Sequence, residues 1–441
     1  MSINFIKKFV PQPVFSLYHL GLGFVGNALN LFPSRKLHLI GITGTKGKTT
    51  TAYFAYQMFL QNKKRVALTS TVMFAIGRKT EPNLTKMGMP GRFFLPRFLR
   101  RAYLSGMEYA IIESTSEGIA QHRARFLDYN TVVFTGLSPE HIERHGGFVN
   151  YRKAKEKLFK KCQGVHIINL KDKYAHYFWS YPAKEKWGVV LDKKDIHQYA
   201  PAGIRRMIVG KTLKEGRIKI SEVEVRKKEI VLEEAMVKLP FIGKFNGLNV
   251  LTAFAIGRSV GISFSDLAKT IAKLKLPEGR VEEIKNKKIN YRLFLDYAHE
   301  PLSLKSVLEA CREILPKGKK LICLTGGQGG GRDRWKRKVM GAIASKLSDY
   351  VIIATEDPYD ENPEKINWDI LQGVLSNKKF REGKNCFVFL DRQEGIKKAL
   401  SLAKKDDIVL LAGKGGEKKM CVGEKMIPWN EREVVEEILK V

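Results

Sequence analysis

The sequence predicts an α/β protein with two domains, each built on a mostly parallel sheet. Short apolar runs alternate with helical stretches from residue 37 onward, which is the pattern of βα units. A proline and a glycine interrupt this alternation near Lys275–Arg280, and it then resumes. The 441 residues suffice for two or three domains of ordinary size. We expect a short N-terminal segment at 1–36, a central domain at 37–276 and a C-terminal domain at 277–441.

The central domain is expected to hold one series of buried strands and one ribbon. The expected buried strands are Leu37–Thr43, Arg65–Thr71, Tyr109–Ser114, Thr131–Thr135 and Val165–Leu170. Residues Arg217–Val225 instead alternate apolar and polar side chains with period two, which predicts an antiparallel ribbon. A helical pattern follows at Asn246–Val260.

The C-terminal domain repeats the βα alternation. Its expected strands are Tyr291–Leu295, Lys320–Leu324, Tyr350–Ala354, Cys386–Leu390 and Ile408–Leu411. Helical stretches separate them, so the sequence predicts a smaller Rossmann-like α/β domain that follows the larger central domain in the chain.

Composition excludes several classes of protein and favours an anionic partner. The 44% apolar and 28% charged residues are ordinary for a globular protein and exclude a fibrous, wholly disordered or multi-span membrane protein. The net charge of +33 favours phosphate-bearing small molecules, nucleic acid or an acidic membrane face, although a solvated basic surface is an alternative. Five scattered cysteines indicate a reducing cytosol and argue against a zinc ribbon or a disulfide scaffold.

The N-terminal segment is unusually apolar. Residues 9–34 contain no Lys, Arg, Asp or Glu, and basic residues stand on both sides of them. Three interpretations remain open: a helix packed on the globular body, an interfacial membrane helix that makes peripheral contact, and a membrane span. No small-residue cleavage site follows, which argues against a signal peptide.

A glycine loop lies between the first expected strand and the helix that follows it. Gly44 and Gly47 would let backbone N–H groups approach phosphate oxygens. Lys48 would supply a positive charge to the terminal phosphates, and the Thr49 hydroxyl could bind Mg²⁺. Strand, loop, Lys-Thr and helix together predict a nucleotide phosphate site.

The loop sequence Thr43-Gly-Thr-Lys-Gly-Lys-Thr-Thr-Thr51 resembles the ATP loop of the Mur ligases, in particular the UDP-N-acetylmuramoyl-tripeptide synthetases (MurE type). The family usually has Asn where this chain has Lys46. The resemblance covers about residues 36–441 and implies an ATP-dependent ligase. It implies that the loop residues that bind the nucleotide are Gly44, Thr45, Lys46, Gly47, Lys48, Thr49 and Thr50.

Two further segments resemble the metal-binding motifs of the family. Ile112-Glu-Ser-Thr-Ser116 implies that Glu113 binds Mg²⁺ together with Thr49. The stretch around His141 resembles the family's T-N-L-x-x-D-H-L-D-x-H and implies that this histidine binds a second Mg²⁺. Tyr151-Arg-Lys-Ala-Lys155 implies a carbamylated Lys155 as an additional ligand, although a solvated helix lysine is the alternative. The implied catalytic set is Lys48, Glu113, His141 and Lys155.

Other matches concern the rest of the nucleotide and the two substrates. The resemblance implies contacts to the nucleotide from Asn246, Asn249, Arg280, Asp296 and His299, and N-capping is an alternative role for Asn246. It implies contacts to the acceptor from Thr85, Ser116 and Arg123. It implies contacts to the incoming amino acid from Arg334, Asp357, Tyr359, Gly413 and Glu417.

The segment Glu356-Asp-Pro-Tyr359 bears on the choice of amino acid. Family members that select diaminopimelate have D-N-P-R here, and Tyr359 stands at the position of their arginine. Because Asp357, Asp360 and Glu361 make the region acidic, the sequence favours a cationic side chain such as lysine.

The resemblance therefore implies a monomeric cytoplasmic enzyme of peptidoglycan precursor synthesis. ATP would phosphorylate the carboxylate of a UDP-N-acetylmuramoyl-peptide-like acceptor, and the amino acid would attack the acyl phosphate. Family members normally begin with a uridine-binding domain, which residues 1–36 are too few to form. A folylpolyglutamate-synthase-like ligase with another acceptor remains an alternative. Alternatives of another class are a non-ligating nucleotide-binding protein and a nucleic-acid-dependent NTPase, although no motif predicts a nucleic-acid partner.

Overall fold

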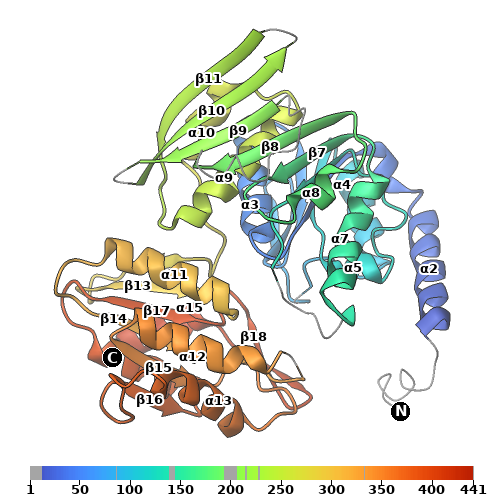
Figure 1. Ribbon diagram of the computed structural model, residues 1–441. Helices are drawn as coiled ribbons and strands as arrows, with labels where there is room; N and C mark the ends of the chain where they lie inside the picture. Colours follow the sequence, from blue (N-terminus) through green and yellow to red (C-terminus); the bar gives the residue numbers. More distant parts are fainter. Residues whose placement is uncertain are drawn as a thin grey trace. The chain divides into compact units, whose positions relative to one another are not determined.

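The computed structural model describes residues 12–85, 87–138, 145–192, 206–213, 216–226, 229–331 and 333–440. The chain divides into two compact units (Figure 1). Unit 1 comprises Met1–Pro240 and Gly247–Lys275, and unit 2 comprises Phe241–Asn246 and Leu276–Val441. Each unit is an α/β structure with its own sheet, and unit 2 is the smaller, so the predicted fold class is confirmed.

Unit 1 is built on a sheet that has eleven strands in the described residues, in the order β11-β10-β9-β8-β7-β6-β1-β5-β2-β3-β4. Neighbours from β9 to β2 pair in parallel, and the strands beyond them on both sides are antiparallel. The strands are β1 (His38–Thr43), β2 (Val66–Thr69), β3 (Met73–Ile76), β4 (Lys79–Pro82), β5 (Tyr109–Glu113), β6 (Thr131–Phe134), β7 (Val165–Asn169), β8 (Glu185–Leu191), β9 (Arg206–Thr212), β10 (Arg217–Arg226) and β11 (Glu229–Lys238).

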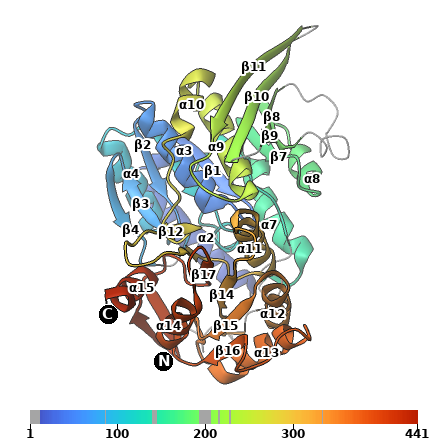
Figure 2. The same cartoon turned by 90° about the vertical axis from the view of Figure 1, so that its left-hand side faces the viewer.

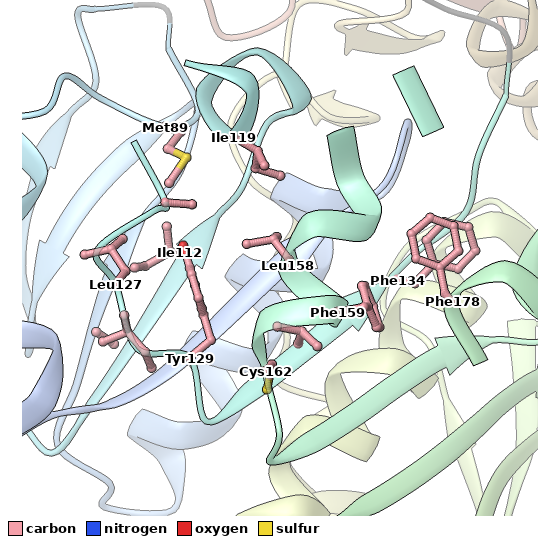
Figure 3. Packing of buried hydrophobic residues seen from close by; sticks show 14 of the residues in the cluster. Met89, Ile112, Ile119, Leu127, Tyr129, Phe134, Leu158, Phe159, Cys162 and Phe178 are labelled. Atoms are coloured by element: carbon pink, nitrogen blue, oxygen red, sulfur yellow. The ribbon is translucent and has the colours of Figure 1, made fainter. Parts of the chain in front are cut away.

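Helices pack on this sheet and bury its central strands. The helical elements are α2 (Gln12–Leu29), η1 (Pro33–Lys36), α3 (Lys48–Gln61), α4 (Phe94–Leu104), α5 (Ser116–Ala120), α7 (Phe148–Lys161), α8 (Ala175–Trp179), α9 (Lys244–Ser259) and α10 (Phe264–Ile271). One buried cluster joins helix α7 to the sheet: it contains Leu158 and Phe159 of α7 together with Ile112 of β5 and Phe134 of β6 (Figure 3). Phe134 of β6 stacks on Phe178 of α8 with ring centroids 3.9 Å apart. These apolar contacts fix the strand ends that carry the site.

Unit 2 has a six-stranded sheet in the order β12-β13-β17-β14-β15-β16 and a separate hairpin, β18–β19. Its strands are β12 (Glu282–Ile284), β13 (Arg292–Asp296), β14 (Leu321–Thr325), β15 (Tyr350–Ala354), β16 (Cys386–Phe389), β17 (Ile408–Ala412), β18 (Lys419–Val422) and β19 (Lys425–Pro428). Its helices are α11 (Pro301–Ile314), α12 (Trp335–Leu347), α13 (Pro363–Leu375), α14 (Arg392–Leu402) and α15 (Glu431–Lys440).

The predicted strands all form, with ends that differ by at most two residues. The predicted ribbon also forms, as β9–β10–β11, an antiparallel extension of the sheet (Figure 2). The prediction missed the hairpins β3–β4 and β18–β19 and the strands β8 and β12. Strands β4 and β19 are exposed along their whole length, so they lack the apolar runs that marked the others.

Candidate active site

The phosphate loop joins β1 to α3. Gly44 and Gly47 have φ angles of 151° and 80°. A Cβ atom at Gly44 would lie 2.1 Å from Thr135 Oγ1, and one at Gly47 would lie 2.5 Å from Asn249 Oδ1. Because neither position has room for a side chain, the backbone stays bare at the N-terminus of a 14-residue helix. This is the arrangement that binds phosphate groups.

Hydrogen bonds from neighbouring elements hold the loop. The Thr45 N–H donates to the Gly136 carbonyl at 2.7 Å, and the Thr45 and Tyr151 hydroxyls lie 2.9 Å apart. The Thr135 hydroxyl donates to the Lys46 carbonyl at 2.6 Å. The loop is therefore fixed by β6, the segment after it and α7.

Two lysines converge on the first carbonyl of the loop. Lys48 Nζ donates to the Gly44 carbonyl at 2.9 Å and to the Thr45 carbonyl at 2.8 Å. Lys155 Nζ, from α7, donates to the same Gly44 carbonyl at 2.7 Å. Lys155 is buried, with Nζ 4.5 Å from the centre of the Tyr151 ring. Its side chain thus belongs to the phosphate site and not to a solvated helix face.

Glu113 lies at the carboxyl end of β5, beside the first turn of α3. The Thr49 hydroxyl donates to Glu113 Oε2 at 3.0 Å and to Oε1 at 3.1 Å, and the Thr71 N–H donates to Oε2 at 2.8 Å. Oxygen donors of this kind suit Mg²⁺, which keeps water and substrate oxygens among its ligands. In the described part of the chain, no group of three or more His, Cys, Asp and Glu side chains forms a metal cage. The pair therefore fits a magnesium ion completed by phosphate and water oxygens.

Of the other residues expected near the loop, the structure describes Thr50 and Asn249 but not His141. Thr50 is buried in the first turn of α3, and Asn249 reaches the same helix, with its Oδ1 3.4 Å from the Thr51 hydroxyl. Asn249 therefore lies at the phosphate site. His141 lies outside the described residues, so the expected second metal ligand stays a prediction.

Ser116 opens the short helix α5, which Thr115 caps by accepting a hydrogen bond from the Gly118 N–H at 3.2 Å. The Ser116 hydroxyl lies 3.2 Å from His145 Nε2. His145 was not predicted as a site residue, although it stands at the last histidine of the motif T-N-L-x-x-D-H-L-D-x-H. Ser116 follows Glu113 by three residues, so the expected acceptor residue and the expected metal ligand lie at the same end of β5.

Thr85 lies in the loop between β4 and α4, and Arg123 contacts this loop. The Thr85 hydroxyl donates to Asn83 Oδ1 at 2.6 Å, and Asn83 Nδ2 donates to the Met87 carbonyl at 3.0 Å. The Arg123 guanidinium donates to the Met89 carbonyl and to Gln121 Oε1, the latter at 2.8 Å. The loop thus links two of the three expected acceptor residues.

Arg92 is a charged residue beside Arg123 that the sequence motifs did not reveal. Burial lowers the pKa of both guanidinium groups, and the charge of Arg92 adds to the lowering at Arg123. Within the described residues, Arg92 Nη2 and Arg123 Nε are buried without a hydrogen-bond partner. Two neighbouring cations with unused donors suit an anion.

Unit 2 brings Arg280, Asp296 and His299 together around Tyr297. The Arg280 guanidinium lies 4.3 Å from the centre of the Tyr297 ring, and the rings of Tyr297 and His299 are 4.4 Å apart. Asp296 accepts a hydrogen bond from the Val281 N–H at 2.7 Å. Burial raises the pKa of Asp296 to about 6, although the nearby Arg280 lowers it.

Asp357 and Glu417 share one buried lysine. Lys414 Nζ lies 2.9 Å from Asp357 Oδ1 and 2.6 Å from Glu417 Oε2. Asp357 also accepts a hydrogen bond from the Cys421 N–H at 2.7 Å, and the Tyr297 hydroxyl donates to Glu417 at 3.2 Å. Two expected amino-acid-binding residues therefore meet, through a lysine that was not predicted.

Glu356 is a third carboxylate of this cluster and was also missed. It is completely buried, and its Oε1 accepts a hydrogen bond from Gln328 at 3.1 Å. A Cβ atom at Gly413, whose φ is 116°, would lie 2.5 Å from Glu356 Oε2. Burial, and then the charge of Asp357, raises the pKa of Glu356 to about 7. Gly413 therefore leaves space for this carboxylate.

Tyr359 and Arg334 occupy the neighbouring loops. Tyr359 has a φ of 52°, and its N–H donates to the Cys421 carbonyl at 3.1 Å, which ties it to β18. Arg334 pairs with Glu361 at 3.4 Å, and Glu361 also binds Arg337 at 2.9 Å. The structure thus joins Tyr359 to the cluster through Cys421 and gives Arg334 a partner in Glu361.

The N-cap role that was the alternative for Asn246 is wrong, because Asn246 lies inside the first turn of α9. Helix α9 begins at Lys244, and the Asn246 side-chain amide donates to the Ile242 carbonyl at 2.9 Å. An N-cap side chain accepts a hydrogen bond from the helix backbone, whereas this one donates to the preceding loop.

A sheet of parallel strands with a bare phosphate loop, a lysine and a Thr–Glu pair at its carboxyl edge defines a nucleotide-dependent α/β enzyme. The family model described as the Mur ligase middle domain matches residues 42–257, and that described as the Mur ligase, glutamate ligase domain matches residues 279–415. The chain belongs to the Mur ligase family.

Curated relatives extend the match over nearly the whole chain. The UDP-N-acetylmuramoyl-L-alanyl-D-glutamate–2,6-diaminopimelate ligase of Caldanaerobacter subterraneus subsp. tengcongensis is 34% identical over 411 residues, which cover 92% of this chain and 79% of that protein. The ligase 1 of the same name from Clostridium acetobutylicum is 34% identical over 423 residues, covering 96% and 81%.

Solved structures share the fold. A pseudomurein peptide ligase type C from Methanothermus fervidus aligns with a TM-score of 0.63 at 20% identity, covering 91% of this chain and 79% of that one. The MurF ligase of Thermotoga maritima, solved in complex with ADP, aligns with a TM-score of 0.63 at 18% identity, covering 94% and 83%.

Proposed function

We propose that this chain is an ATP-dependent, ADP-forming ligase that adds an amino acid to a UDP-N-acetylmuramoyl-peptide-like acceptor in peptidoglycan precursor synthesis. The observation that carries the proposal is the Thr49–Glu113 contact beside the bare phosphate loop. The relatives named above support the reaction class, because their names specify the addition of an amino acid to such an acceptor.

The chain's own residues would hold ATP and Mg²⁺ as follows. The loop from Gly44 to Thr50 would bind the phosphates, with Lys48 exchanging its internal carbonyl partners for phosphate oxygens. Thr49 and Glu113 would bind one Mg²⁺, and His141 with a carbamylated Lys155 would bind a second. Bound Mg²⁺ would neutralise charge on the phosphates. Asn246, Asn249, Arg280, Asp296 and His299 would contact the remainder of the nucleotide.

The reaction follows from charge and position. The acceptor carboxylate attacks the γ-phosphorus of ATP, ADP leaves, and an acyl phosphate forms. The amine then attacks the acyl carbon, loses a proton, and phosphate leaves as the amide bond forms. Because carboxylate and ATP are both anions, Lys48 must offset their repulsion. Arg123, with Arg92, would hold an anionic group of the acceptor, and Thr85 and Ser116 would orient it.

The carboxylates of unit 2 favour a cationic amino acid. Asp357 and Glu417 both pair with the ammonium group of Lys414, and Glu356 is near enough to feel the charges of Asp357 and Lys414, so the cluster is acid-rich. Tyr359 stands where the resemblance expects an arginine for the distal carboxylate of diaminopimelate. We therefore propose lysine or a similar cationic amino acid as the substrate, with Gly413 leaving room beside Glu356 and Arg334 at the edge of the site.

The test is phosphate release from ATP with Mg²⁺, bicarbonate and UDP-N-acetylmuramoyl-dipeptide, with lysine, diaminopimelate and other amino acids supplied singly. Release that requires both the acceptor and one amino acid is expected. Release without acceptor dependence, or none, would contradict the proposal. We also propose that the enzyme acts as a monomer in the cytoplasm, with peripheral membrane contact through residues 9–34.

A further inference from the structure

We propose that helix α2 docks flat on the surface of an anionic phospholipid membrane. This inference names the partner of the apolar N-terminal segment, and it concerns where the enzyme works and not which bond it makes. The helix lies at the edge of unit 1, where its neighbour is α4 (Figure 1). The face of α2 that packs on unit 1 carries small residues, and the opposite face exposes large apolar side chains.

The inner face of α2 is made of small residues. Gly23, Gly26 and Asn27 are buried at the spacing of one helix face. A Cβ atom at Gly26 would lie 2.4 Å from the Arg92 carbonyl, and one at Gly23 would lie 3.4 Å from the His122 carbonyl. Within residues 17–29, whose side chains the structure describes, the helix therefore packs on unit 1 by close backbone approach, together with an edge contact of the Phe24 ring on Phe126.

The outer face of α2 carries the large apolar side chains. We use this name for Leu17, Tyr18, Phe24, Val25 and Leu29, whose exposed fractions range from 44% to 70%. Their spacing places them on one stripe of the helix. A surface helix of a water-soluble domain normally turns such residues inward. In α2 the arrangement is reversed, so the outer face needs an apolar partner.

Basic residues lie at the C-terminal end of this stripe. The Arg100 guanidinium donates to the Leu29 carbonyl at 3.2 Å, and the chain continues from the helix to exposed Arg35 and Lys36. We call Arg35, Lys36 and Arg100 the basic rim. Asp128 binds Arg35 at 3.3 Å and offsets part of its charge.

The combination selects an anionic bilayer surface over other partners. Residues 9–34 carry no charge, whereas the rim and the net charge of +33 attract anionic headgroups. Within the described part of the chain, no helix is long and apolar enough to cross a membrane. A helix with an apolar face bordered by cations lies in the interface, with its apolar side chains among the acyl chains.

The experiment is co-sedimentation of the full chain with vesicles of phosphatidylcholine alone and of equal parts phosphatidylcholine and phosphatidylglycerol. The outer-face variant is Leu17→Gln/Val25→Gln/Leu29→Gln, and its matched control is Leu232→Gln/Met236→Gln on β11, which also removes exposed apolar side chains. The rim variant is Lys36→Gln/Arg100→Gln, and its control is Lys378→Gln/Lys379→Gln, which removes the same charge from exposed lysines of unit 2.

We expect the full chain to sediment with the anionic vesicles only, and we expect added salt to weaken this binding. The outer-face variant should lose about tenfold or more of the partition coefficient, and the rim variant about fivefold for each charge removed. Both controls should bind like the full chain. Circular dichroism and soluble ligase turnover check that each variant is folded.

Equal sedimentation of the outer-face variant and the full chain, or no sedimentation of the full chain with anionic vesicles, would overturn the proposal. So would a concentration-dependent dimer that the outer-face variant abolishes without any vesicle binding, which would assign the face to a second copy of the chain. Absence of ligase turnover in every protein would count against the proposed reaction and not against the docking, because sedimentation needs no substrate.

Discussion

The Thr49 hydroxyl donates to both carboxylate oxygens of Glu113, at 3.0 and 3.1 Å. The contact crosses two adjacent parallel strands, because β1 leads into the helix of Thr49 and β5 ends at Glu113. Both side chains are buried, so their geometry is set by the sheet and not by solvent.

Glu113→Gln should abolish most of the activity while the fold is retained. The amide keeps the size of the side chain and can still accept a hydrogen bond from the Thr71 N–H, but it cannot neutralise a cation. We expect kcat to fall by about 10²-fold or more, the scale of losing one preorganised electrostatic contact. Phosphate release across a magnesium titration measures this. Glu108→Gln, which removes a carboxylate from an exposed pair with Arg65, is the control and should stay near the parent rate.

Gly47→Ala should weaken nucleotide binding more than its conformational strain explains. The new Cβ would lie 2.5 Å from Asn249 Oδ1, in a backbone conformation with a φ of 80°. Gly106→Ala is the matched control, because Gly106 has a φ of 78° and no atom within 4 Å of the Cβ position. Both variants should lose about 1 kcal/mol of stability, and only Gly47→Ala should lose about tenfold or more in ADP affinity by calorimetry. Equal affinities would contradict the prediction.

Lys155 should react with CO₂ if it supplies the extra metal ligand. Carbamylation adds a carboxylate to Nζ, which now lies 2.7 Å from the Gly44 carbonyl. Growth or incubation with ¹³C-bicarbonate should give a carbamate carbon signal in the NMR spectrum of the parent that Lys155→Gln lacks. Lys153→Gln, on an exposed position of the same helix, should keep the signal. A signal that survives in Lys155→Gln would rule out this lysine as its source.

Tyr359→Arg should shift amino-acid selection toward diaminopimelate. The arginine would bring a fixed positive charge to a loop tied to β18 through the Cys421 carbonyl. We expect the ratio of kcat/KM for diaminopimelate to that for lysine to rise about tenfold, the value of one charge-assisted contact. Competition between the two amino acids in one assay measures the ratio directly. Tyr359→Phe should leave it nearly unchanged, and an unchanged ratio in Tyr359→Arg would exclude this loop as the selector.

Glu356 should make unit 2 less stable as the pH rises. Its pKa is raised from the ordinary 4.5 to about 7, so the folded state holds a proton that the unfolded state has released. The stabilisation is complete below pH 4.5 and is lost as the pH approaches 7. Glu356→Gln removes this dependence. The free energy of unfolding of this variant relative to the parent should therefore be about 1 to 3 kcal/mol higher at pH 8 than at pH 4.5. Chemical denaturation of both proteins at the two pH values measures the difference. Asp296, whose pKa is also raised, contributes equally to both proteins and cancels.

The sequence predicted the parts of this protein whose signals are local. Strand β1 is an uninterrupted apolar run ending in a glycine loop, and both features are visible in a few residues. The pairing of Thr49 with Glu113 was also predictable, because the carboxyl ends of neighbouring parallel strands meet at one edge of a sheet. The hairpin β18–β19 was missed, because it is short and β19 is wholly exposed.

The cluster around Lys414 could not be predicted from residue patterns. Asp357 and Lys414 are 57 residues apart, and the acidic segment alone gave no sign of the lysine. Only the fold turns Asp357 inward and supplies a buried ammonium group. Likewise Arg92 carried no motif, and its relation to Arg123 depends on Gln121, which both guanidinium groups contact.

The two lysines on the Gly44 carbonyl have a consequence for the thermodynamics of nucleotide binding. Lys48 would leave that carbonyl for a phosphate oxygen, but Lys155 holds it at 2.7 Å and the Thr135 hydroxyl holds the Lys46 carbonyl at 2.6 Å, so the loop has its binding shape before any nucleotide arrives. The entropy of ordering the loop is then lost during folding, and little of it remains to oppose binding. Calorimetry should accordingly find a small conformational entropy cost for ADP, and Lys155→Ala should make this cost larger by freeing the loop.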